Sequence, residues 1–370
     1  MLTARHYVPI LKWKRAEQGA LKDLREDQKT LMMPLIEVVM PKPKDSSVAS
    51  LDDAVVIFKD VRTLEIPKEI LQSWGEDPIF VDLSLIYPSD LKLFGMENIV
   101  RNCHILRLSP VPVLNLSDDD NYKLLVASIN KEHNTGICLR VTSSDLKDIG
   151  VLDTKLRKFL SDYGFSASAI DLLVDLKDIT EFDKYKTAVQ QSQKISNLKE
   201  WNSFIFADGS YPQDLSNCRK DEYNLIPRND WKNWNKQVKT EWMSRIPTYA
   251  DYTIRHPIYN ESLQMFHPTA SIKYALEDNW LILKGEKQRF DQFLGHAKLL
   301  IDSPNKEFYG EEFSAGDKYI SDKGKYYEEY ARKKKQDPKK AKGTGNTEQW
   351  IRSGINHHLS VVADQLSKMV

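Results

Sequence analysis

"YVPILKWKRAEQGAL" (Tyr7–Leu21) joins an apolar, strand-like run to the beginning of an amphipathic helix. The run ends in Lys-Trp-Lys, whereas strands usually end in turn residues such as Gly, Asn or Asp. Alternation along a strand places Lys12 and Lys14 on one side and Trp13 on the other. The stretch therefore predicts the first βα unit of an α/β fold, with two lysines at the carboxyl end of its strand and Trp13 packed against a neighbouring helix.

The same pattern recurs along the first 255 residues. Eight short apolar runs are separated by helix-length segments. The runs are Tyr7–Lys12, Pro34–Val39, Pro78–Leu83, Val111–Leu116, Gly136–Val141, Ile170–Leu176, Ser203–Asp208 and Tyr249–Ile254. Nearly continuous apolar strands that alternate with helices indicate a parallel sheet covered on its outer face. Eight such units close most simply into a (β/α)8 TIM-like barrel. An open doubly wound sheet is the rival, but it would usually have a glycine-rich first loop, and "KWKRAEQG" has one glycine.

After the eighth run the pattern changes. Ser271–Glu286 contains two alternating runs around Asp278-Asn279, which predicts a β-hairpin, and residues 287–302 follow with a helical pattern. The domain prediction is therefore a barrel over residues 1–257 and a C-terminal extension over residues 258–370, packed on the barrel.

The rest of the extension is polar at first and then amphipathic. Residues 316–346 are lysine-rich and end in Gly-Thr-Gly, so we expect a mobile loop there. Its basic part, 323–342, also carries tyrosines, a combination that can meet a phosphate backbone. Asn346–Leu366 begins with a Thr-Glu capping pattern and has an apolar face, which predicts a terminal helix that docks on the protein.

Composition limits the classes of function. The chain of 370 residues has 53 Lys and Arg against 53 Asp and Glu, so any attraction to nucleic acid must be local. Cys103, Cys138 and Cys218 form no CxxC pair, which argues against a disulfide scaffold or a zinc ribbon. The sequence has neither a signal peptide nor an apolar run long enough for a bilayer. We therefore expect a cytoplasmic protein without membrane contact.

Polar side chains gather at the carboxyl ends of the predicted strands, where (β/α)8 barrels bind and convert substrates. They are Lys12, Lys14, Glu37, Asp82, Asn115, Arg140, Asp175, Lys177, Asp208, Asp251, Arg255 and His256. Any one of them is explained by a structural ion network at the rim. Taken together, they predict a site.

The predicted site has two kinds of residue. Glu37, Asp82 and Asp175, assisted by His256, are the predicted catalytic residues. The predicted substrate-binding residues are Lys12, Lys14, Arg140 and Arg255, because Arg offers phosphate a planar fork and Lys a point charge.

A divalent metal is an alternative occupant, because three carboxylates and His256 suit an ion that activates water. No recognised ligand spacing identifies such a metal. His357 and His358 are adjacent, and neighbouring helical residues point about 100° apart, so we expect packing or capping there instead of a shared ion.

Four stretches together resemble the beta-protein family, named for a protein of T-even phages and also found in bacterial genomes. They are the opening stretch, "PLIEV", "ADYTIRHP" and "GNTEQWIRSGINHHLSVVADQL". The resemblance covers almost the whole chain. It implies a part in phage and host conflict, with a protein partner encoded in the same locus, and it supplies no catalytic residues.

Two functions are consistent with these observations. The first is an enzyme that acts on a phosphate-bearing substrate such as a nucleotide or nucleic acid, a hydrolase of phosphoester bonds. The alternative is a recognition protein that binds a phage component, nucleic acid or partner subunit through the barrel rim without chemistry, since a fold does not fix a function.

Overall fold

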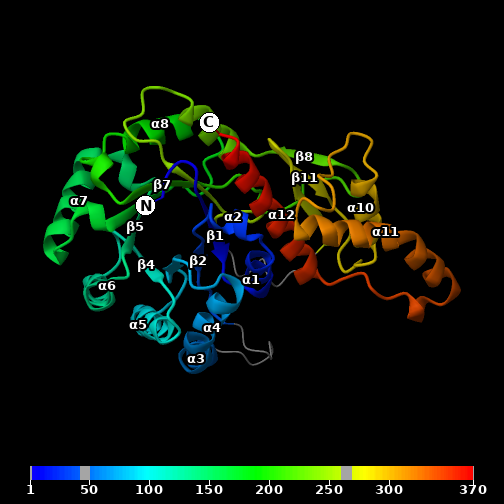
Figure 1. Ribbon diagram of the computed structural model, residues 1–370, viewed down its shortest axis with the longest axis horizontal. Coiled ribbons are helices and arrows are strands. Elements are labelled where there is room, and N and C mark those ends of the chain that lie inside the picture. The colour runs from blue at the N-terminus through cyan, green and yellow to red at the C-terminus, as the bar shows by residue number, and fades with distance from the viewer. Residues whose placement is uncertain (1, 42–50, 260–268, 370) are drawn as a thin grey trace. The chain divides into compact units, whose positions relative to one another are not determined.

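The computed structural model describes residues 2–41, 51–259 and 269–369. The chain forms two compact units (Figure 1). The first consists of residues 1–14, 31–208 and 233–252, and the second consists of residues 15–30, 209–232 and 253–370. The second unit thus takes residues 15–30, 209–232 and 253–257 from within the range predicted for the barrel.

The first unit is a closed barrel of eight parallel strands. In spatial order they are β1 (Tyr7–Lys12), β2 (Leu35–Glu37), β3 (Ile79–Asp82), β4 (Pro110–Asn115), β5 (Ile137–Thr142), β6 (Ile170–Asp175), β7 (Ser203–Asp208) and β9 (Thr248–Asp251). Strand β1 closes the barrel, because Ile10 is paired with Leu35 on one side and Val8 with Ala250 on the other. The predicted (β/α)8 barrel is confirmed, and the open sheet is excluded.

Helices lie outside these strands (Figure 1). They are α3 (Leu51–Ile57), α4 (Thr63–Ser73), α5 (Ser89–Ile105), α6 (Asp120–His133), α7 (Ile149–Tyr163) and α8 (Phe182–Ser192), while α9 (Asn229–Val238) precedes β9. Local sequence sets their ends. Asp119 and Asp148 accept hydrogen bonds from the backbone at the beginning of α6 and α7. Gly164, at φ +69°, ends α7 in the left-handed conformation.

The barrel interior is filled by alternate residues of the strands. The apolar part of this core includes Val8, Ile10, Leu35, Phe80, Val113, Cys138, Leu173, Ile205 and Ala250. Cys138 is fully buried here, and burial raises the pKa of its thiol well above the usual value. It is therefore a small core residue, as the sequence suggested.

The second unit contains a three-stranded antiparallel sheet in the order β10 (Ile272–Ala275), β11 (Asn279–Leu283), β8 (Asn224–Pro227). The predicted hairpin is confirmed by β10 and β11. Its helices are α1 (Arg15–Lys22), α2 (Glu26–Lys29), α10 (Gln292–Ile301), α11 (Ala315–Gln336) and α12 (Thr347–Ser367). Among the described residues, no helix combines the length and the apolar character needed to cross a bilayer.

The terminal helix α12 is the centre of this unit. Every residue from Ser353 to Ala363 is buried, and Asn356 donates to the Ala20 carbonyl of α1 at 3.0 Å. Its first turn is capped by Asn346 with Gln349, not by the predicted Thr-Glu pair. His357 lies 2.8 Å from both the Asp317 carboxylate and the Ala275 carbonyl oxygen. The predicted helix and the packing role of the histidine pair are confirmed, and the packing of the extension on the barrel stays a prediction.

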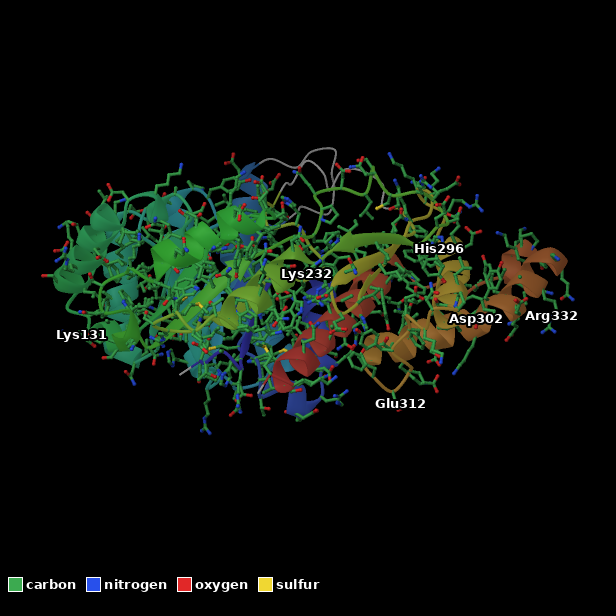
Figure 2. The ribbon with its side chains drawn as sticks, turned by 90° about the horizontal axis from the view of Figure 1, so that it is seen from above. Lys131, Lys232, His296, Asp302, Glu312 and Arg332 are labelled. Atoms are coloured by element: carbon green, nitrogen blue, oxygen red, sulfur yellow. The ribbon has the colours of Figure 1, made fainter. Side chains whose placement is uncertain are left out.

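The predicted lysine-rich loop is wrong over most of its length, because the structure shows helix α11 up to Gln336. Ser314 caps the helix, and ion pairs at i,i+4 such as Lys318 with Asp322 support its exposed face. Figure 2 shows Arg332 on the last turns of α11, where the side chains point outward. The polar composition reflected a solvated helix face and not a loop.

Helices α11 and α12 approach closely at Gly316. A Cβ added there would lie 2.2 Å from the Ser353 carbonyl oxygen, whereas one added at Gly295 of α10 would lie 3.5 Å from Tyr327, an ordinary contact. We predict that Gly316→Ala lowers the free energy of unfolding by about 1 to 3 kcal/mol. Gly295→Ala, the matched control, should leave it unchanged or raise it by up to about 1 kcal/mol. Urea unfolding of both variants measures the difference, and equal stabilities would contradict the close packing.

Candidate functional site

Polar residues form the last layer of the barrel interior. Each stands two positions after an inward apolar residue, so strand alternation turns it into the barrel. They are Lys12 after Ile10, Glu37 after Leu35, Asp82 after Phe80, Arg140 after Cys138, Asp175 after Leu173 and Tyr252 after Ala250. All six are at least nine-tenths buried. The alternation along each strand that turns apolar side chains into the core therefore also gathers charged groups at the carboxyl end of the barrel.

Arg140 is the centre of this layer. Its Nη1 donates to the Glu37 carboxylate at 2.9 Å and also to Asp82. Its Nε and Nη2 donate to Asp175 Oδ2 at 3.0 and 2.7 Å, and Nη2 also donates to the Tyr252 hydroxyl at 2.7 Å. Burial alone would lower the pKa of Arg140, but the surrounding negative groups outweigh burial and raise this pKa well above its usual value.

Two lysines complete the arrangement. Lys12 forms an ion pair with Glu37. Lys177 lies 2.9 Å from Asp175 Oδ2 and donates to the Tyr252 hydroxyl at 3.0 Å. We call these seven residues the barrel cluster: Lys12, Glu37, Asp82, Arg140, Asp175, Lys177 and Tyr252.

Lys177 differs from the rest of the barrel cluster in two respects. Its side chain is 36% exposed, and its backbone has φ +64°, a left-handed conformation that lysine seldom adopts. The Lys177 backbone N–H donates to Asp175 Oδ1 at 3.0 Å, which ties this turn to the cluster. Lys177 is thus a cation held in place at the solvent side of a buried network.

The barrel cluster is charge-balanced, with three carboxylates against Lys12, Arg140 and Lys177. Burial by itself raises the pKa of Glu37, but Lys12 and Arg140 outweigh it and lower that pKa to about 2. The pKa of Asp175 is lowered for the same reason, chiefly by Arg140 and Lys177 against its own burial. Burial raises the pKa of Tyr252 well above its usual value, so its hydroxyl stays protonated. At neutral pH Glu37 and Asp175 are therefore ionised.

The structure brings together five of the eight predicted site residues. They are Lys12, Glu37, Asp82, Arg140 and Asp175. Lys14 lies two residues beyond β1 and is half-buried. Arg255 and His256 belong to the second unit, where Arg255 pairs with Glu17 at 3.0 Å and His256 accepts from the Ile258 backbone at 3.2 Å.

Sequence reasoning missed Tyr252, and it placed Lys177 at the barrel rim without giving it a catalytic or binding role. Tyr252 stands two positions after the inward residue Ala250, so strand period could have revealed it. Lys177 lies two residues beyond β6, and its left-handed backbone has no sequence signal. Trp13 was placed correctly, because its indole donates to Glu69 of α4 at 2.8 Å on the outer side of the barrel.

A divalent metal has no ready site here. Among the residues that the structure describes, no three His, Cys, Asp or Glu side chains are grouped in a way that suits a metal ion. The three carboxylates of the barrel cluster are directed at Arg140, whose positive charge would repel a second cation placed between them. The donor set therefore fits an internal guanidinium better than a metal.

Comparison with known proteins gives one family. The family model described as Beta protein matches residues 7–364, nearly the whole chain. No curated protein matches the sequence. The matched range includes segments of both units.

The Tyr252 hydroxyl offers a specific test of the barrel cluster. It accepts from Arg140 and Lys177 and donates to Asp175 at 2.8 Å. We predict that Tyr252→Phe lowers the free energy of unfolding by about 1 to 3 kcal/mol, because it leaves buried charged groups without a partner. The matched control is Tyr122→Phe, whose buried hydroxyl makes only a 3.4 Å bond to the Val113 carbonyl and should cost less than about 1 kcal/mol. Equal losses in urea unfolding would show that the Tyr252 contacts add nothing specific.

Proposed function

The chain belongs to the Beta protein family, and on that premise we propose that it takes part in phage and host conflict by binding a phosphate-bearing ligand, such as a nucleotide or nucleic acid, through its barrel cluster. The phage and defence context implied by the sequence resemblance supports the first part of this proposal. The geometry of the barrel cluster supports the second.

One observation carries the ligand assignment: three acidic and three basic side chains are gathered in the barrel cluster, five of them in the last interior layer and Lys177 at its solvent side. Buried ion pairs stabilise a fold poorly, and apolar side chains of similar volume often do as well or better. The stability of the fold alone therefore does not explain why six charged side chains are gathered at this end of the barrel. The carboxyl end of a (β/α)8 barrel is the usual position of a ligand site.

Lys177 is the group best placed to meet a ligand. It is partly exposed and stands in a left-handed backbone conformation, and strain of that kind gathers at functional sites. A phosphate group can take the Lys177 ammonium from Asp175, because Asp175 would keep its two hydrogen bonds from Arg140. Arg140 thus fixes the site and Tyr252 holds Asp175 in place, while Lys177 presents its ammonium to the phosphate.

The protonation of the barrel cluster favours recognition without chemistry. A general base works best when its pKa lies near the working pH, whereas the pKa of Glu37 is about 2 and that of Asp175 is lowered as well. Recognition of a phosphate-bearing ligand is therefore our first proposal, and hydrolysis of a phosphoester, with or without a divalent metal, is the second.

Binding by Lys177→Met tests the proposal. This variant keeps most of the alkyl stem and removes the charge, so we predict affinity for labelled nucleotides or oligonucleotides about 10- to 100-fold weaker, equivalent to about 1.5 to 3 kcal/mol. The matched control is Lys158→Met on α7, which removes a lysine that is 74% exposed and paired with Asp162. Fluorescence anisotropy at low salt measures the affinities.

The same samples separate the two candidate functions. Product analysis with and without divalent metals would show hydrolysis, and loss of product in Lys177→Met would favour the enzyme. Binding without product under every condition would favour recognition. Wild-type affinity in folded Lys177→Met would contradict the proposed site in either case.

A further inference from the structure

The second unit contains a separate group of polar side chains: Glu17, Tyr211, Arg255 and Lys273, which we call the second-unit cluster. They come from α1, the segment after β7, the segment after β9, and β10. None of them belongs to the barrel cluster. Each has a polar atom that lacks a hydrogen-bond partner within the described part of the chain.

The ion pair between Arg255 and Glu17 uses only part of each side chain. Arg255 Nε and Nη2 both donate to Glu17 Oε1, at 3.3 and 3.0 Å. Glu17 Oε2 is buried and accepts no hydrogen bond, and Arg255 Nη1 has no acceptor among the described residues. The Arg255 side chain is 31% exposed, so part of it is within reach of a ligand from solvent.

Lys273 lies beside this pair. Its ammonium is 4.5 Å from the centre of the Tyr211 ring, and no described residue accepts a hydrogen bond from it. Loss of water around the ammonium and the nearby charge of Arg255, opposed by Glu17, together lower the pKa of Lys273 to about 7. The hydroxyl of Tyr211 is buried without a partner. Lys273 is thus half-buried above an aromatic face, next to a second cation, with its hydrogen-bond donors unused.

The unused atoms define the chemistry of a partner. Lys273, Arg255 Nη1 and the Tyr211 hydroxyl are donors, whereas Glu17 Oε2 is an acceptor. Leaving such groups unpaired is costly, so a ligand that pairs them gains that free energy on binding. A phosphate group offers three terminal oxygens to three separate donors, whereas a carboxylate has only two oxygens in one plane.

We propose that the second-unit cluster is a binding site for a small phosphate monoester that also carries a hydroxyl group. The phosphate accepts hydrogen bonds from Lys273, Arg255 and Tyr211. The ligand hydroxyl donates to Glu17 Oε2. The negative charge of the phosphate lies between two cations that otherwise repel each other, and it holds Lys273 in its protonated form.

Equilibrium dialysis with glycerol 3-phosphate tests this site in the full chain. The wild-type protein should bind it saturably, and folded Lys273→Met should bind at least about tenfold more weakly, because a charge-assisted hydrogen bond is lost. Tyr211→Phe keeps the ring under Lys273 and removes only the hydroxyl, so its affinity should fall by about three- to tenfold. This second variant keeps the test valid if Lys273→Met does not fold.

Two control variants locate the binding. Lys318→Met removes an exposed lysine of α11 that pairs with Asp322 and should bind as the wild type does. Lys177→Met changes the barrel cluster and should also bind normally, which separates this site from the proposed function. The inference is overturned if the wild type shows no saturable binding, if folded Lys273→Met and Tyr211→Phe keep full affinity, or if only Lys177→Met loses it.

Discussion

The guanidinium of Arg140, buried in the interior of the barrel, is the constraint on which the carboxyl end of the first unit depends. A charge taken out of water is costly unless it is neutralised and its hydrogen bonds are satisfied. Carboxylates from three other strands and the Tyr252 hydroxyl meet that need. Lys12 and Lys177 then balance the remaining negative charge. One buried cation thereby dictates the side chains at the ends of several strands.

The fold and most of the barrel cluster could be predicted from the sequence because both follow from a period of two. Apolar residues such as Ile10 and Leu173 mark the inward face of a strand, and the next inward residues are Lys12 and Asp175. The eight strands were recognisable because a parallel strand covered on both faces is an almost continuous apolar run. The last one ends at Asp251, earlier than predicted, where Thr253 adopts φ +55°.

What could not be predicted depended on contacts distant in sequence. Arg255 and His256 follow the predicted strand Tyr249–Ile254 directly, so they were assigned to the barrel mouth, whereas the structure groups them with the second unit. Strand β8 is a short, half-exposed run, and only its pairing with β11 makes it a strand. Helix α11 was predicted to be a loop because most of its residues are polar or charged. Its buried residues, such as Ile320 and Gly324, are too few for a clear helical pattern in the sequence. In each case tertiary packing outweighed local composition.

The pH dependence of stability in Arg140→Met tests most directly whether Arg140 organises the barrel cluster. In the wild type the pKa values of Glu37 and Asp175 are lower in the folded than in the unfolded chain. They therefore contribute stability at pH values above the unfolded-state pKa values, and this contribution is lost as the pH falls toward the folded-state values. Without Arg140 at least one buried carboxylate lacks a cation, so its pKa rises and the folded variant takes up protons that stabilise it as the pH falls. We predict that the variant is less stable by about 3 to 5 kcal/mol at about pH 7, and that urea unfolding shows this deficit shrinking toward about pH 4. A deficit near zero at neutral pH, or one that does not change with pH, would contradict the account.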